Sequence, residues 1–354
     1  MGRRTTIRRL LIAGIGAVLV LGAGIGGVTL SGEAQAQKML FFRIASGAAG
    51  GTYFPMAGLL GQVISNPPGA RSCQKGGNCG MEGLVAFAQS THGSVANVSS
   101  LDADQVESAF VQSDVTYWAY TGTGPFADKR PFKKLCVLSS LYPEHVQVVA
   151  GKDRGIKTVY DLKGKKVAIG LPDSGVLVGA RLVLGAHGLA ENRDFMPEYV
   201  KSKTAAAMIR DGHLDAFIDV SGYPSMGISD MAKEFGLTLV AVEGKERDSL
   251  IAKAPFYSAD VIPAKTYAGL DNPVETVTVS ALWVSRTNLP EDLHYGAVNG
   301  LYGNIRAPYL LNNGHAKGKN LTLESHHLGV PIPYCPGAAR FYKEKGVYKA
   351  PSAP

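Results

Sequence analysis

A glycine-rich turn near the start of the chain is the strongest candidate for a binding site. This turn, residues 46–51, follows an apolar run at residues 40–45 and precedes a segment with helical apolar spacing. A strand that turns through glycines into a helix leaves backbone N–H groups unpaired at the positive end of the helix dipole. Thr52 and Tyr53 add hydroxyl groups there. The turn is therefore predicted to bind an anion, with Gly51, Thr52 and Tyr53 among its contacts.

Two phosphate-binding patterns do not fit this turn. The Walker A motif requires a lysine directly after its last glycine, and this sequence has Thr52 at that position. The dinucleotide fingerprint G-x-G-x-x-G also fails to match the spacing of the glycines. Nucleotide binding is thus not expected. The alternative to an anion site is a tight turn that needs small residues for its geometry alone.

Polar residues follow other predicted strands in the same way. The apolar runs 84–89 and 109–111 end in polar segments, and so does the run 167–169 in the second half. Ligands of open α/β sheets bind at the carboxyl ends of strands, so these polar residues are candidate contacts. Helix capping is their alternative role, since Ser, Asn and Asp are favoured N-cap residues. The predicted ligand-binding residues are Gly51, Thr52, Tyr53, Ser94, Asn97, Gln112, Asp114, Asp173, Ser174, Gly175 and Pro224.

The two halves of the chain share one plan. The turn at residues 170–175 follows a strand and opens a helix, as the turn at residues 46–51 does. Further along, the strand 215–219 mirrors the strand 108–112. The fold class is therefore predicted to be α/β, with two similar lobes that face each other.

Two apolar strands, residues 145–150 and 276–284, are natural crossover segments between these lobes. They are predicted to form a two-strand hinge. The predicted division is residues 37–145 for the first part of lobe I, residues 146–250 for lobe II, and residues 251–354 for the return crossover and the completion of lobe I.

The first 36 residues have the features of an export signal. Four arginines precede an apolar stretch from Leu10 to about Leu30, and Ala34 and Ala36 form a small-x-small cleavage pattern. A retained anchor is the alternative, since about twenty apolar residues can span a bilayer. Many of these residues are Gly or Ala, which favours cleavage before Gln37 and a periplasmic protein. Both Sec and twin-arginine export stay open.

Charge and motifs argue against several classes of function. Without residues 1–36, which hold four arginines and one glutamate, the formal net charge falls from +7 to +4. No basic block or basic–aromatic stripe is present, so nucleic acid is not an expected partner. The segment around Ser174 lacks the G-x-S-x-G elbow, and the adjacent His326 and His327 would chelate a metal poorly. No catalytic residue, metal site or cofactor is predicted, although a hydrolase triad can be hidden in a sequence.

Four cysteines are present in the chain. Cys73 and Cys79 flank a short glycine-rich loop and are predicted to form a disulfide in an oxidising compartment. Zinc is the rival interpretation, but the C-x5-C spacing without a nearby histidine is poor for a zinc site. Cys136 lies in an apolar run and is expected to be a buried thiol, and Cys335 is expected to be free as well.

Several segments together resemble the TAXI-type solute receptors of tripartite ATP-independent periplasmic (TRAP) transporters. The resemblance implies a type II periplasmic-binding fold that captures a small organic acid or amino acid. It also implies integral membrane TRAP permease subunits as partners, and a monomeric receptor. A periplasmic ligand sensor shares every one of these sequence features and is the first alternative. A periplasmic hydrolase is a second, less favoured alternative. The matching segments are residues 45–55, 93–97, 110–114 with Tyr117, Ala119 and Tyr120, 161–167, 211–217 and 336–346.

The chain departs from the family pattern at three places. Asp173-Ser174-Gly175-Val176 stands where the family usually has Gly-Ser-Gly-Thr, Cys335 stands where a histidine is common, and the Cys73–Cys79 loop resembles an insertion. A carboxylate at a helix N-terminus competes with a bound anion. A monocarboxylate or a zwitterion, with its ammonium facing Asp173 or Asp114, is therefore favoured over a dicarboxylate.

Overall fold

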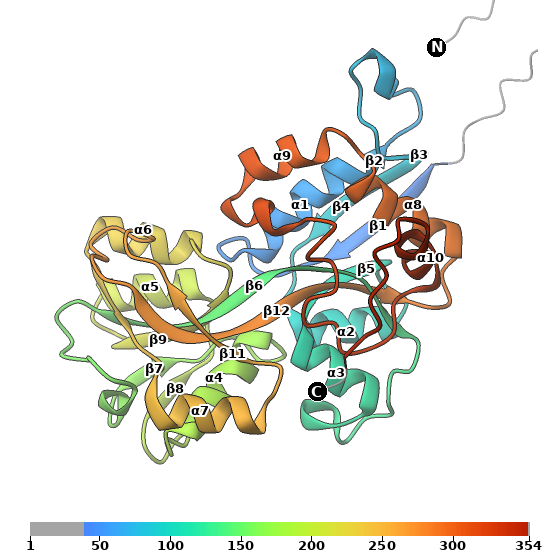
Figure 1. The fold of residues 1–354 in the computed structure, drawn as a ribbon. Coiled ribbons are helices and arrows are strands. Elements are labelled where there is room, and N and C mark those ends of the chain that lie inside the picture. The colour runs from blue at the N-terminus through green and yellow to red at the C-terminus, as the bar shows by residue number, and fades with distance from the viewer. Residues whose placement is uncertain (1–38, 353–354) are drawn as a thin grey trace, which may run out of the picture. The chain divides into compact units, whose positions relative to one another are not determined.

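The computed structural model describes residues 39–352, so the predicted export signal lies outside the described residues. A ten-stranded sheet runs through this part of the chain (Figure 1). Its strand order is β4 (Leu84–Gln89), β1 (Leu40–Ala45), β5 (Ser108–Gln112), β12 (Val274–Arg286), β6 (Leu135–Gly151), β9 (Ala216–Ser221), β7 (Lys166–Ala168) and β8 (Met196–Glu198). In addition, β10 (Leu237–Val240) pairs with β6, and β11 (Ser258–Ile262) pairs with β12. The short strands β2 (Ser65–Asn66) and β3 (Met81–Glu82) form a separate pair.

Helices cover both parts of this sheet. They are α1 (Tyr53–Ile64), α2 (Ser94–Asp102), α3 (Ser113–Thr121), α4 (Gly175–Ala186), α5 (Ser202–Arg210), α6 (Met226–Glu234), α7 (Gly244–Lys253), α8 (Glu291–Tyr302), α9 (Ala307–Gly314) and α10 (Pro336–Glu344). In α4, Leu177, Ala180 and Leu184 are buried, a spacing that places them on one face of the helix. Among the described residues, no helix is both long enough and apolar enough to cross a membrane.

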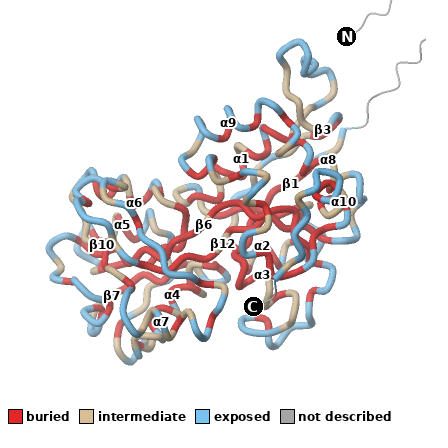
Figure 2. Tube along the Cα trace, in the orientation of Figure 1, coloured by how far each residue is buried: buried red, intermediate tan, exposed pale blue. Residues whose placement is uncertain are grey.

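Each lobe has its own apolar core. The first core takes residues from 42–142 and again from 281–342, so two separated parts of the chain build lobe I. In lobe II, Val148 and Val149 belong to two different clusters. Successive residues of a strand point to opposite faces, so these clusters lie on the two faces of the sheet. Figure 2 shows the burial concentrated along the central strands.

The strands β6 and β12 belong to both lobes. Leu138 on β6 lies in the first core and Val146 in the second, while β12 contributes Val277 to the second core and Trp283 to the first. The two strands pair antiparallel, with His145 opposite Thr278. Figure 1 shows β6 and β12 running side by side between the two lobes. The predicted α/β fold with two lobes and two crossover strands is therefore confirmed.

The apolar packing of lobe II continues beyond residue 250. Ile262, Tyr267 and Leu270 pack in the lobe II cluster that contains Val149, although the sequence places them in the segment of the return crossover. The pairing of β11 with β12 places this segment against the crossover strand. The hydrophobic contacts of lobe II thus extend up to the point where β12 enters lobe I.

All four cysteines are paired. The predicted disulfide between Cys73 and Cys79 is present. The expectation of free thiols at Cys136 and Cys335 is wrong, because these two residues form a second disulfide. Cys136 lies on β6 and Cys335 directly precedes α10, and the two sulfurs meet in the core of lobe I. Their separation of 199 residues explains why local patterns did not reveal the bond.

Candidate functional site

A cavity of about 280 Å³, here called the interlobe cavity, is lined by residues from both lobes. Lobe I contributes the glycine-rich turn and the ends of neighbouring strands, and lobe II contributes the turn before α4, the start of α5 and the end of β9. Both sets lie at carboxyl ends of strands, as expected for an open α/β sheet. The polar lining residues are Thr52, Tyr53, His92, Ser94, Gln112, Glu144, Ser174, Lys201, Ser202, Lys203, Thr204, Asp219 and Ser221.

Four helices begin at this cavity. Their first residues, which all line it, are Tyr53, Ser94, Gly175 and Ser202. Ser174 caps α4 by accepting a hydrogen bond from the backbone N–H of Leu177. The other three helices have no side-chain cap within the part of the chain that the structure describes. Helix N-termini carry unpaired N–H groups and about half a positive charge each. The lining therefore favours a negatively charged group.

Gln112 supplies an unpaired amide to the same cavity. Its side chain is 2% exposed, and neither amide atom has a hydrogen-bond partner within residues 39–352. A buried polar group without a partner costs about 1–3 kcal/mol. Because Gln112 lines the cavity, a bound molecule with a donor and an acceptor would remove this cost.

Two buried carboxyl groups lie on the cavity wall. Tyr53 donates a hydrogen bond of 2.6 Å from its hydroxyl to Oε2 of Glu144. Burial raises the pKa of Glu144 well above its usual range, and the nearby Asp219 and Asp114 raise it further. Burial also raises the pKa of Asp219, although Ser221 and Ser202 donate hydrogen bonds to it and oppose the shift. Both acids therefore favour their neutral forms, or a cation beside them.

Direct hydrogen bonds hold the two lobes together around the cavity. The hydroxyl of Thr52 donates to the carbonyl oxygen of Gly222 at 2.7 Å. The backbone N–H of Ala96 donates to the carbonyl oxygen of Asp173 at 2.9 Å. Since both bonds connect lobe I with lobe II, the structure represents a closed arrangement of the lobes.

Seven of the predicted ligand contacts line the interlobe cavity: Gly51, Thr52, Tyr53, Ser94, Gln112, Ser174 and Gly175. Four predicted contacts do not line it. The amide nitrogen of Asn97 donates to the carbonyl oxygens of Ser46 and Phe110 and so holds the glycine-rich turn in place. Pro224 follows Tyr223 through a cis peptide bond.

The two predicted aspartates also lie outside the interlobe cavity. Asp114 accepts hydrogen bonds from the hydroxyl of Tyr257 and the backbone N–H of Val115. Asp173 lines a different cavity, beside Trp118. Neither carboxylate is therefore positioned to meet an ammonium group in the interlobe cavity. Of the described acidic residues, Glu144 and Asp219 line it.

Sequence reasoning missed these two cavity acids. Asp219 could have been found, because the strand 215–219 mirrors the strand 108–112, which ends in Gln112. Both residues line the cavity, Gln112 from lobe I and Asp219 from lobe II. Glu144 gave no such signal, because it lies within the long strand β6 instead of following the end of a strand.

The buried Asp114 predicts a pH-dependent stability. Burial raises its pKa to about 6 from 3.8, so the stability gained from the neutral acid is complete below pH 3.8 and is lost as pH rises through 6. Replacing Asp114 with Asn is expected to stabilise the protein by about 1–3 kcal/mol at pH 7.5 and by nothing at pH 3.5. Denaturant unfolding at both pH values measures this. The exposed Asp128→Asn is the control, and a variant less stable than wild type at pH 7.5 would contradict the prediction.

Two solved structures and one protein family are similar to this chain. The chain is similar to the alkanesulfonate-binding protein SsuA from Xanthomonas axonopodis pv. citri bound to MOPS, with 16% identity, 81% of this chain and 79% of that chain covered, and a TM-score of 0.44. It is similar to a binding protein component of an ABC phosphonate transporter from Pseudomonas aeruginosa, with 11% identity, 78% and 79% covered, and a TM-score of 0.46. The sequence model of the NMT1-like family matches residues 44–346. That match spans almost all of the described residues, and the chain therefore belongs to the NMT1-like family.

Proposed function

We propose that this protein is an extracytoplasmic solute-binding protein that holds a small organic acid or amino acid in the interlobe cavity. The observation that carries the proposal is the buried amide of Gln112, which has no hydrogen-bond partner among the described residues. It lies in a cavity where four helices begin. A solute bound between two lobes on a hinge is released when the lobes separate. This motion favours a protein that captures and delivers a solute over an enzyme.

The lining supports a ligand with one carboxylate. The N-termini of α1, α2 and α4 and the amide of Gln112 offer donors for it. Glu144 and Asp219 disfavour a second negative charge and would accept an ammonium group. A monocarboxylate or a zwitterionic amino acid is therefore favoured over a dicarboxylate.

Within the solute-binding proteins, we propose the TAXI type, a receptor that passes its ligand to membrane-embedded TRAP permease subunits. This proposal rests on the sequence segments that resemble the TAXI family. Co-purification of the protein with a permease from membranes, dependent on the ligand, would test it. Capture of a membrane kinase in place of a permease would favour the sensor alternative.

A thermal-shift screen of amino acids, 2-keto acids and dicarboxylates, followed by calorimetry, tests ligand binding. A ligand at a hundredfold excess over its dissociation constant is expected to stabilise the protein by about 2.7 kcal/mol. Gln112→Ala is expected to weaken binding about tenfold or more, because it removes a donor and an acceptor. The exposed Gln105→Ala should bind as wild type does. Equal affinity of Gln112→Ala and wild type would contradict the placement of the site.

A further inference from the structure

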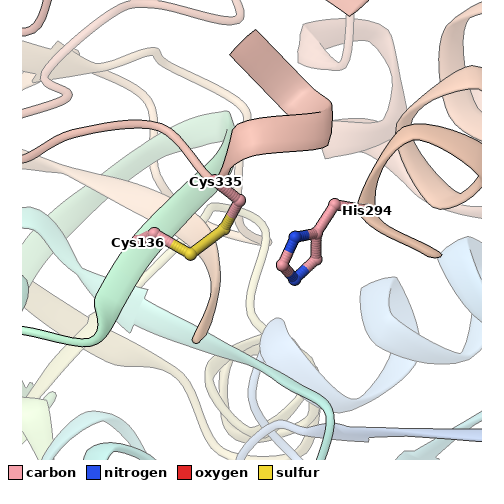
Figure 3. Close-up of side chains that lie close together, drawn as sticks. All are labelled: Cys136, His294 and Cys335. Atoms are coloured by element: carbon pink, nitrogen blue, oxygen red, sulfur yellow. A yellow bond between two sulfur atoms is a disulfide. The ribbon is translucent and has the colours of Figure 1, made fainter. Parts of the chain in front are cut away.

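Three potential metal ligands meet in the core of lobe I, and none of the three lines the interlobe cavity. They are Cys136 on β6, His294 on α8 and Cys335 at the start of α10, and all are 0% exposed. One ligand atom from each lies within 4.8 Å of the others. Figure 3 shows the imidazole of His294 facing the disulfide between the two cysteines.

The hydrogen bonds around His294 determine which of its nitrogens carries the proton. Ser285 has one hydroxyl proton and donates it to the carbonyl oxygen of Glu107 at 2.6 Å. The same Ser285 oxygen lies 3.2 Å from Nε2 of His294. It can only accept there, so Nε2 must be the protonated nitrogen of the imidazole.

The other nitrogen of His294 is therefore an unprotonated acceptor. Nδ1 is buried and has no hydrogen-bond partner within residues 39–352. A buried acceptor without a donor is unfavourable. An imidazole that donates one N–H to an outer partner and presents its other nitrogen to two sulfurs has the arrangement typical of a metal-ligating histidine.

We propose that Cys136, Cys335 and His294 form a buried site for Cu(I) when their disulfide is reduced. Two thiolates and one imidazole are soft ligands that suit Cu(I). Structural zinc sites have four ligands. Among the described residues, no fourth His, Cys, Asp or Glu joins the cluster, so three-coordinate Cu(I) fits better than Zn²⁺.

The site and the disulfide are two states of the same sulfurs. A dithiol reductant supplies two electrons and two protons, its own thiols become a disulfide, and the Cys136–Cys335 bond opens to two thiols. Cu(I) then displaces the two thiol protons, and Nδ1 of His294 completes the coordination without releasing a proton. The metal ion does not change its oxidation state in this step.

The experiment uses the full chain with Cys73→Ser and Cys79→Ser, which removes the two other thiols. The protein is reduced with a phosphine in denaturant, refolded without oxygen, and titrated with Cu(I) against a chromophoric chelator. We expect one Cu(I) per reduced chain and none in the oxidised chain. Circular dichroism follows folding, and a reduced chain that folds only with Cu(I) also supports the site. No binding by the reduced chain, or a chain unfolded even with Cu(I), overturns the proposal.

Two variants separate ligation by His294 from binding to the thiols alone. Ser285→Ala removes the partner of Nε2 and is expected to weaken Cu(I) binding about ten- to hundredfold. His294→Ala should weaken it more, whereas the exposed His213→Ala should leave it unchanged. Undiminished affinity in His294→Ala would overturn the three-ligand site, and stronger binding of Zn²⁺ than of Cu(I) would overturn the choice of ion.

Discussion

Replacing Gly175 with valine is expected to weaken ligand binding at least about hundredfold while both lobes stay folded. Gly175 is the first residue of α4, and a Cβ atom there would lie 1.7 Å from Oε1 of Gln112 and 2.7 Å from Oγ of Ser94. Both of these residues belong to lobe I. The added side chain must therefore displace them from the cavity or hold the lobes apart, and a hundredfold loss corresponds to about 2.7 kcal/mol.

Calorimetry with a ligand from the screen measures the affinity of this variant, and small-angle X-ray scattering measures whether the lobes still close. Gly185→Val is the matched control, because Gly185 lies on the same helix and no atom of residues 39–352 comes within 4 Å of its Cβ position. Wild-type affinity in Gly175→Val would show that ligand binding does not require the close approach of α4 to Gln112.

Removing the buried disulfide is expected to destabilise the protein far more than removing the surface disulfide. The Cys136–Cys335 bond closes a loop with a separation of 199 residues, for which the chain-entropy relation predicts about 5 kcal/mol. The Cys73–Cys79 bond spans only 6 residues and is worth about 2 kcal/mol by the same relation. In addition, replacing Cys136 and Cys335 with alanine leaves unfilled space in the core of lobe I.

Denaturant unfolding of the Cys136→Ala/Cys335→Ala and Cys73→Ala/Cys79→Ala variants compares the two bonds directly. Each double variant serves as the control for the other, since both lose two sulfur atoms. Intact-mass analysis after alkylation without reduction should find no modified cysteine in wild type. A smaller loss of stability for the buried pair than for the surface pair would contradict this ranking.

Much of the fold could be predicted because short sequence patterns indicate its strands, turns and helices. Glycine-rich turns follow apolar strands at residues 46–51 and 170–175, and each is followed by apolar residues at helical spacing. These patterns depend on neighbouring residues only, so they reveal strands, helices and the plan of two similar lobes. The crossover strands were recognisable for the same reason, since each is a long apolar run.

The site was only partly predictable, because type and position do not fix what a side chain contacts. Asn97 and Gln112 carry the same amide group, yet Asn97 donates to the backbone of its own lobe. The amide of Gln112 has no hydrogen-bond partner within residues 39–352 and lines the cavity. Packing between distant segments decides between these roles. The same is true of Cys136 and Cys335, which only the folding of lobe I brings together.

The chain passes from lobe I to lobe II along β6 and returns along β12, and this path affects the order in which the lobes can fold during synthesis. Lobe II is continuous, and its cores are complete once residue 279 has been made. Lobe I is interrupted in the sequence by lobe II. When residue 279 has been made, lobe I still lacks Trp283 and Phe341, which are among the largest buried side chains. Proteins with several domains generally fold their N-terminal domain first as the chain emerges from the ribosome. Here the middle of the chain can fold first, and the N-terminal part must wait for the last seventy or so residues before its core can close.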